Sequence, residues 1–194
     1  MEELWYKVAL GMLLGLFCLI TSPAIWRYKR AEKTTSRNSR LDWFLVLLNV
    51  LGMTVVPAAY VLTPRRDYPA MHLPDMIRSA GIVLYALGLG FMWWILHTLG
   101  TNWSMFLELG CEHQLIRAGP YRYIRHPMYA CFYLLMAAQL LISSNWVVGL
   151  FGLATWDLLY RFRVPREEQM LLAEFGEKYA AYMRQTGRIV PKFR

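Results

Sequence analysis

The stretch from His126 to Trp156 reads HPMYACFYLLMAAQLLISSNWVVGLFGLATW and contains no Asp, Glu, Lys or Arg. As one straight helix, its 31 residues would be about 46 Å long, which exceeds the roughly 30 Å of hydrocarbon in a bilayer. The polar triplet Ser143-Ser144-Asn145 interrupts the run. We therefore predict a hairpin of two short membrane-spanning helices, residues 127–142 and 146–161.

Three more uncharged runs precede this hairpin, and each is long enough to cross the hydrocarbon once. They are found at Val8–Trp26, Trp43–Pro64 and Ser79–Leu107, the last turning polar near His97. The complete set of predicted spans is 5–26, 43–64, 79–98, 127–142 and 146–161. The sequence thus predicts an all-α integral membrane protein with five transmembrane helices, built as a single membrane domain over residues 1–194.

The composition agrees with a location in lipid. Of the 194 residues, 57% are hydrophobic and 18% are charged, and the mean hydropathy is +0.28. A disordered or water-soluble chain needs more polar residues than this. No basic helix or aromatic-basic platform recurs in the sequence, so we predict no nucleic-acid partner.

The basic residues predict the topology. The net charge is +8, and 17 of the 21 Lys and Arg residues lie in residues 27–42, residues 100–125 and the tail from residue 161 onward. Cytoplasmic loops of membrane proteins carry the excess of Lys and Arg. We therefore expect the N-terminus outside and the C-terminus in the cytoplasm, with segments 105–126 and 162–194 cytoplasmic.

The tail from Val164 has the pattern of an amphipathic helix. Pro165 suits a first helical turn, and Thr186-Gly187 is a plausible end. Its apolar stripe consists of Leu171, Phe175, Tyr179 and Tyr182. We predict a separate cytoplasmic C-terminal helix, and periodicity leaves open whether it covers the membrane surface or contributes to a site.

The densest polar stretch runs from Glu108 to Tyr129, with two His, three Arg, two Glu and three Tyr. Pro127 fits the first turn of a helix, which places His126 near the cap. The helix N-terminus, Arg122 and Arg125 could receive an anionic group here. Interfacial anchoring by Arg and Tyr is the alternative reading.

A second polar group straddles the inner end of the fifth predicted span. It consists of Asp157, Arg161, Arg163, Glu167 and Glu168. Asp157 and Arg161 are four residues apart and are expected to form a helix salt bridge. Ionisable residues at this depth are costly, so Arg163 and Glu167 become functional candidates.

Several site classes find no support. Cys111-x-His113 lacks a second ligand pair, so no metal site is predicted. The chain has no G-x-S-x-G elbow, G-x-G-x-x-G fingerprint or P-loop. Hydrolases of the elbow type and soluble nucleotide folds are therefore not indicated.

Four motif blocks follow one another in the C-terminal half. They are His113-Gln-Leu-Ile, Gly119-Pro-Tyr121, Arg125-His-Pro-Met-Tyr129 and Glu167-Glu-x-x-Leu171-x-x-x-Phe175-Gly-Glu-x-Tyr179. Their order and spacing resemble the isoprenylcysteine carboxyl methyltransferase family over about residues 106–191. The resemblance implies an integral-membrane enzyme that transfers a methyl group from S-adenosyl-L-methionine to the free carboxylate of a prenylated C-terminal cysteine.

The resemblance also implies roles for individual residues. The cofactor contacts it implies are Glu108, His113, Gln114, Leu115, Ile116, Tyr121, His126, Pro127, Met128, Tyr129 and Glu167. Arg163 takes the catalytic role of meeting and orienting the substrate carboxylate. The segments 105–126 and 162–194 are then expected to form the cofactor site, with a lipophilic carboxylate entering from the membrane lipid.

The chemistry is compatible with these residues. A carboxylate is already ionised at pH 7, so its methylation needs alignment and removal of water but no general base. Aromatic faces such as those of Tyr121 and Tyr129 can stabilise a sulfonium cation. The residues leave open a phospholipid N-methyltransferase, an NADPH-dependent membrane reductase of related architecture, and a non-enzymatic membrane scaffold.

Overall fold

The computed structural model describes residues 2–30, 33–36, 40–63, 70–104, 108–110 and 115–192. Its main helices are α1 (Glu2–Arg30), α2 (Arg40–Val50), α3 (Val56–Leu62), α4 (Asp75–Leu99), α5 (Pro127–Ser143), α6 (Trp146–Phe175) and α7 (Glu177–Gln185). A π-helix, η1 (Leu51–Val55), joins α2 to α3, and short 3₁₀ turns cover Gly100–Asn102 and Gly119–Arg122. Two short strands, β1 (Lys33–Ser36) and β2 (Glu108–Gly110), pair antiparallel.

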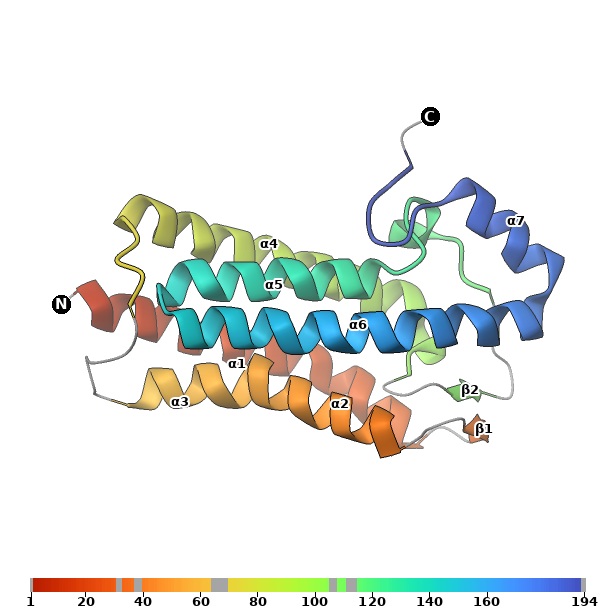
Figure 1. Ribbon diagram of the computed structural model, residues 1–194, viewed down its shortest axis with the longest axis horizontal. Coiled ribbons are helices and arrows are strands. Elements are labelled where there is room, and N and C mark those ends of the chain that lie inside the picture. The colour runs from red at the N-terminus through yellow and green to blue at the C-terminus, as the bar shows by residue number, and fades with distance from the viewer. Residues whose placement is uncertain are drawn as a thin grey trace.

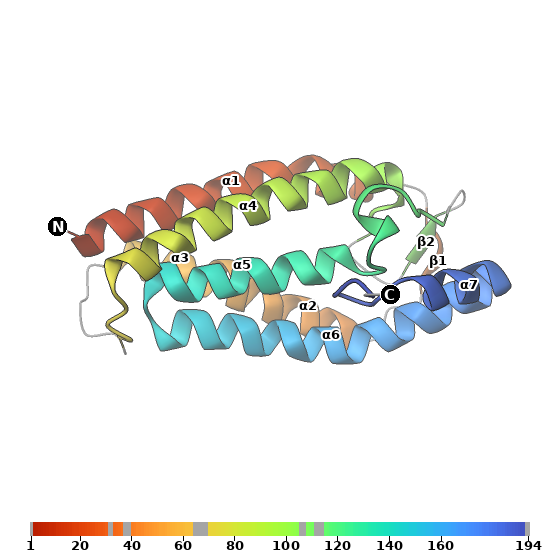
Figure 2. The same cartoon turned by 90° about the horizontal axis from the view of Figure 1, so that it is seen from above.

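The long helices lie side by side along one axis, as the two views in Figure 1 and Figure 2 show. The start of α1, the end of α3, the start of α4 and the α5–α6 turn gather at one end of the bundle. The β1–β2 pair and α7 lie at the other end, where α6 projects beyond the other helices. The elements that carry most of the predicted polar residues therefore gather at this second end.

Within the described ranges, three helical segments are long and apolar enough to cross a membrane: Glu3–Arg30, Arg40–Leu62 and Asp75–Asn102. Each contains most of one of the first three predicted spans. Large apolar side chains on their outer faces are exposed, for example Leu19 at 67% and Leu47 at 60%. The chain is a helical, multi-pass membrane protein. Helix α5 is apolar but shorter, and crossing of the membrane by α5 and α6 stays a prediction.

The turn between α5 and α6 follows from two residues of the Ser-Ser-Asn triplet. Ser144 adopts a left-handed conformation with φ 49°, which reverses the chain after α5. The Asn145 side chain then caps α6, because its Oδ1 accepts hydrogen bonds from the backbone N–H groups of Val147 (2.9 Å) and Val148 (3.1 Å). The polar triplet that interrupts the apolar run thus supplies both the reversal and the cap.

The predicted end of the last helix at Arg161 is wrong, because α6 continues to Phe175 with Pro165 inside it. A proline in a helix removes one backbone hydrogen bond. Here its neighbours hold the turn: Val164 is buried, and Arg166 Nη1 lies 2.7 Å from Asp42 Oδ1 on α2. Pro165 itself is exposed, on the side of α6 away from the buried Val164.

The predicted single tail helix is also wrong. Gly176 has φ 49° and ψ −128°, a conformation that glycine adopts without steric cost, and it separates α6 from α7. The predicted apolar stripe is therefore divided between two helices, with Leu171 on α6 and Tyr179 on α7. The predicted stop at Thr186 is confirmed, since α7 ends at Gln185.

The π-helix η1 has a local cause in Pro57. Proline has no N–H to donate to the carbonyl of Met53, four residues earlier. Gln139 Nε2 of α5 donates to that carbonyl instead, at 3.1 Å. A second buried amide, Asn49 Nδ2, donates to the carbonyl of Thr155 on α6 at 3.1 Å. These two side chains tie the irregular segment to α5 and α6.

Candidate active site

A cavity of about 580 Å³ lies among α1, α2, α4, α5 and α6. One part of its wall is apolar and is formed by membrane helices, with Phe17, Val46, Met53 and Met92 among its residues. The other part is polar and includes Arg125, His126, Arg163, Glu167 and Tyr182. The cavity therefore joins the interior of the bundle to the end where the charged residues gather.

Arg163 and Glu167 stand one turn apart on α6 and line the same cavity. Glu167 Oε2 accepts a hydrogen bond from the Tyr129 hydroxyl at 3.0 Å, which links α6 to the first turn of α5. The Tyr129 ring packs between His126 and Trp156, with ring centroids 5.6 and 5.3 Å away. A guanidinium, a carboxylate and an aromatic face are thus presented together.

Tyr121 reaches the cavity from the 3₁₀ turn at Gly119–Arg122. Gly119 has φ 55°, and a Cβ there would lie 2.7 Å from Thr98 Oγ1, so glycine is needed for the turn to approach α4. Burial raises the pKa of the Tyr121 phenol, and the negative charge of Glu167 raises it further. The phenol is therefore protonated at neutral pH and acts as a hydrogen-bonding group.

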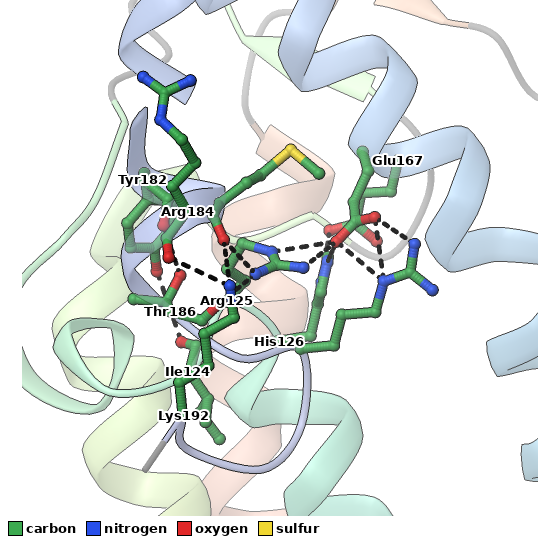
Figure 3. A network of polar contacts seen from close by, with 11 residues as sticks. Ile124, Arg125, His126, Glu167, Tyr182, Arg184, Thr186 and Lys192 are labelled. Carbon is green, nitrogen blue, oxygen red and sulfur yellow. Dashed lines mark hydrogen bonds and ion pairs between the residues drawn. The ribbon is translucent and has the colours of Figure 1, made fainter. Parts of the chain in front are cut away.

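Glu168 is the centre of an ion cluster with Arg125, His126 and Arg188. Figure 3 shows Arg125 and His126 within this network of polar contacts. Glu168 Oε1 accepts from Arg125 Nε at 3.1 Å and lies 3.3 Å from His126 Nε2. Its Oε2 accepts from Arg188 Nη2 at 2.6 Å. Burial alone would raise the pKa of this carboxyl, but hydrogen bonds from His126 and Arg188 and the charge of Arg125 outweigh it, lowering the pKa to about 2.

The structure brings most of the predicted site residues to one cavity. Its wall includes Leu115, Ile116, Tyr121, His126, Met128, Tyr129, Arg163 and Glu167. Pro127 is buried in the first turn of α5, beside that wall. His113 and Gln114 lie outside the described residues, and Glu108 is described only as a backbone position in β2. The roles predicted for all of these residues stay predictions.

Of two expectations about arginines, one is confirmed and the other stays a prediction. The predicted Asp157–Arg161 salt bridge is confirmed, with Arg161 Nε 2.6 Å from Asp157 Oδ2. The expectation that Arg125 could help to receive an anionic group stays a prediction, because Arg125 lines the cavity but its guanidinium already has partners within the protein. Its guanidinium donates to Glu168 and to the carbonyls of Thr186 and Met183. Arg122, named with it, is exposed.

Sequence reasoning missed several residues at this end of the bundle. Arg188 and Tyr182 were not assigned to the site, and Glu168 was left without a role. Consecutive helix positions point about 100° apart, so adjacent glutamates on a continuous α6 must face different surroundings. That signal becomes visible only once α6 is known to continue through Pro165. Arg188 carries no comparable local signal.

Metal binding was not predicted, and the described residues contain no group of three or more His, Cys, Asp or Glu side chains placed to hold an ion. Cys111 and His113, which prompted the question, lie outside those residues.

Residues 81–173 match the family model of the isoprenylcysteine carboxyl methyltransferase (ICMT) family. The resemblance to this family is confirmed. The matched region spans most of α4, all of α5 and α6 up to Ala173. It therefore contains His126, Tyr129, Arg163 and Glu167, whereas α1, α2 and α7 lie outside it.

Three curated relatives are named protein-S-isoprenylcysteine O-methyltransferases. That of Tribolium castaneum is 28% identical over 127 residues, or 64% of this chain and 45% of the relative. That of Schizosaccharomyces pombe is 31% identical over 81 residues, or 41% of this chain and 34% of the relative. Enzyme B of Arabidopsis thaliana is 24% identical over 169 residues, or 76% of this chain and 85% of the relative. The chain thus spans less than half the length of the first two.

A solved structure shares the fold. The eukaryotic intramembrane Ras methyltransferase ICMT superposes with a TM-score of 0.54 and 23% sequence identity, over 77% of this chain and 49% of that chain. This likeness shows an ICMT-type arrangement of membrane helices.

Proposed function

We propose that this protein is an S-adenosyl-L-methionine-dependent methyltransferase that acts within the membrane on the carboxylate of an isoprenylated cysteine or a similar lipophilic acceptor. One observation carries the proposal. A single cavity joins an apolar wall, built by membrane helices, to a polar wall that contains Arg163, Glu167, His126 and Tyr129. An acceptor with a long apolar tail and one carboxylate matches that division.

The apolar part of the cavity suits an isoprenoid chain. Phe17 of α1, Val46 of α2, Met53 of η1 and Met92 of α4 line it. Methionine side chains are flexible and polarisable, so they adapt to irregular apolar ligands. The tail would lie among these helices, with membrane lipid as its source.

Arg163 is the group that would hold the acceptor carboxylate. A guanidinium can donate two parallel hydrogen bonds to a carboxylate, which fixes both its position and its orientation. Helix α6 carries Arg163 one turn before Glu167, so the carboxylate would lie close to the polar wall. Arg163 positions the nucleophile, and its bonds must leave one oxygen lone pair able to attack.

The polar wall fits the groups of S-adenosyl-L-methionine. Glu167 and His126 are hydrogen-bond acceptors for amino and hydroxyl groups, and Tyr121 and Tyr129 offer aromatic faces to a cation. The residues that would hold the cofactor are Leu115, Ile116, Tyr121, His126, Met128, Tyr129 and Glu167. The bound cofactor supplies an electrophilic methyl group on a sulfonium.

The protein's contribution to the rate is alignment and desolvation. The acceptor carboxylate is ionised at neutral pH, so no residue of this chain is needed as a general base. Methyl transfer from bound S-adenosyl-L-methionine would form the ester C–O bond as the C–S bond of the sulfonium breaks, releasing a neutral thioether. Holding two reactants in line is worth up to ~7–11 kcal/mol in well-oriented systems. Aromatic side chains such as Phe132 and Trp156 line the cavity beside Tyr129 and exclude water from the carboxylate.

The proposal includes a topology with five crossings, the N-terminus outside and the cofactor entrance in the cytoplasm. The distribution of basic residues supports it. Single cysteines placed near residue 3 and near residue 184 test it in a background with the three native cysteines replaced. We expect a membrane-impermeant maleimide to label the first from outside and the second only after permeabilisation.

The activity is tested with S-adenosyl-L-methionine carrying a tritiated methyl group and a farnesylated cysteine analogue. We expect a base-labile methyl ester, and no ester from the same analogue already esterified at its carboxylate. Label that appears instead in phosphatidylethanolamine would identify an N-methyltransferase. Calorimetric binding of NADPH without S-adenosyl-L-methionine would indicate a reductase, and binding of neither would indicate a scaffold.

A further inference from the structure

The C-terminal segment after α7 holds the backbone of His126 in place. The N–H of His126 donates to the carbonyl of Arg188 at 2.9 Å, and the N–H of Arg125 donates to the carbonyl of Gly187 at 2.9 Å. Ile124 and Gly187 form a parallel bridge beside these bonds. The backbone conformation of His126 is therefore set by a segment about sixty residues later in the chain.

Glu168 holds the imidazole of the same residue. His126 and Glu168 are each 4% exposed, and His126 Nε2 lies 3.3 Å from Glu168 Oε1. Arg125 and Arg188 both donate to this carboxyl, which keeps it ionised. An ionised carboxylate only accepts hydrogen bonds, so the proton of the pair must be on Nε2.

The second ring nitrogen points to the other side. His126 Nδ1 lies 3.8 Å from Oε1 of Glu167, a residue of the cavity wall, which is beyond hydrogen-bonding distance. A neutral ring with its proton on Nε2 therefore offers the lone pair of Nδ1 on the cavity side.

We infer that Glu168 is a positioning residue that fixes the Nε2–H tautomer of His126 and so presents Nδ1 to the cavity as a hydrogen-bond acceptor for the ammonium group of a cationic methyl donor. The identity of the ligand rests on the proposed function. The tautomer does not, because it follows from contacts within the protein. The two glutamates of α6 then have separate tasks: Glu167 lines the cavity, and Glu168 orients the ring that lines it.

The inference explains why a histidine suits this position. A Nδ1–H group would present a donor to a ligand group that is itself a donor. An imidazolium would add repulsion between like charges. Arg188 supports the arrangement by donating to both oxygens of the Glu168 carboxyl.

Nitrogen NMR of the full-length protein in detergent, with ¹⁵N-labelled histidine, tests the tautomer at pH 7.5 without any ligand. The chain has four histidines, and the spectrum of His126→Asn assigns the signal. We expect a neutral ring protonated at Nε2. A ring protonated at Nδ1, or an imidazolium, would overturn the inference.

The variant Glu168→Gln tests the consequence. Its amide can donate to Nε2, which favours the proton on Nδ1 and reverses the group shown to the cavity. We expect the calorimetric Kd for S-adenosyl-L-methionine to rise roughly tenfold or more, with Glu168→Asp recovering part of the affinity. The NMR signal of His126 should change tautomer in Glu168→Gln.

Arg188→Gln is the matched control, because it removes a partner of the same carboxyl but leaves the contact with His126. We expect it to raise the Kd less than about threefold and to keep the Nε2–H tautomer. Equal weakening by both variants with an unchanged tautomer would reduce Glu168 to a purely structural role. If the wild-type protein binds no S-adenosyl-L-methionine, the proposed function fails, while the NMR result still decides the tautomer.

Discussion

At the end of the bundle where the chain begins, Arg78 is buried and holds helices together. Its Nε donates to the carbonyl of Ile142 at 3.1 Å, its Nη1 lies 2.9 Å from Glu3 Oε2, and its guanidinium stacks 3.8 Å from the centre of the Tyr6 ring. At the other end, Glu168 forms ion pairs with Arg125 and Arg188. There, however, the neighbouring Glu167 and Arg163 line the large cavity.

The difference lies in what the buried charges support. Around Arg78, the charged groups bind α1, α4 and α5 to one another. Around Glu168, the ion pairs support His126, which lines the cavity together with Glu167 and Arg163. Variants at the first end should therefore change stability, and variants at the second end should change ligand binding and turnover.

The largest effect is expected from Arg163→Lys. Lysine keeps the charge but lacks the planar pair of donors that orients a carboxylate. We expect kcat to fall roughly 10²- to 10³-fold, with the Kd for S-adenosyl-L-methionine changed less than about threefold. Single-turnover methyl transfer and calorimetry measure the two quantities. Near-normal turnover would remove Arg163 from the proposed mechanism.

Glu167→Gln should weaken cofactor binding by about 10- to 100-fold, because a hydrogen bond to a charged group is lost at the cavity wall. Glu3→Gln is the matched control at the opposite end and should leave the Kd within about twofold. Calorimetry on both variants makes the comparison. Similar affinities for the two would contradict the contrast between the ends.

Arg78→Gln should lower stability by about 2 kcal/mol, since it removes charged hydrogen bonds among three helices. The expected readout is a lower Tm in detergent, followed by tryptophan fluorescence. Below that Tm, kcat should match the wild-type value. A loss of kcat as large as that of the Arg163 variant would show that the first end also serves catalysis.

The loss of folding stability at acid pH should depend on Glu168. The pKa of its carboxyl is about 2 in the folded protein, below the usual ~4.3 of an unfolded chain. A lowered folded pKa contributes stability above the unfolded value and loses it as the pH falls toward 2. The Tm of the wild-type protein should therefore drop between about pH 4.5 and pH 2, whereas Glu168→Gln should show a flatter profile.

Sequence reasoning succeeded where the signal was local. The length of the apolar run after His126 and its polar triplet predicted a hairpin of two helices, and Asn145 does cap the second helix. It failed at Pro165, because burial of Val164 and the contact between Arg166 and Asp42 preserve a helix that proline alone would interrupt. Propensity is local, whereas these contacts join residues far apart in the chain.

At the site, too, local motifs could be predicted from sequence, and contacts between distant residues could not. Motif spacing named His126, Arg163 and Glu167, which the fold brings to one cavity. It gave no indication that Arg188 returns to Glu168, because that contact depends on the turn at Gly176 and the pairing of Gly187 with Ile124. The motif residues that line the cavity could be named from sequence, whereas Tyr182 of the same wall and the supporting Glu168 and Arg188 could not.

The uninterrupted course of α6 has a mechanical consequence. Trp156, beside the apolar wall, and Glu167, on the polar wall, are eleven positions apart on one helix, so about 16 Å separates them along its axis. No loop lies between them to absorb a change. If the surrounding bilayer thickens or thins, the rod can tilt or shift in depth, but the span between the two walls is preserved. The distance between the apolar and polar parts of the cavity, which the acceptor must span, should therefore not change with the thickness of the bilayer.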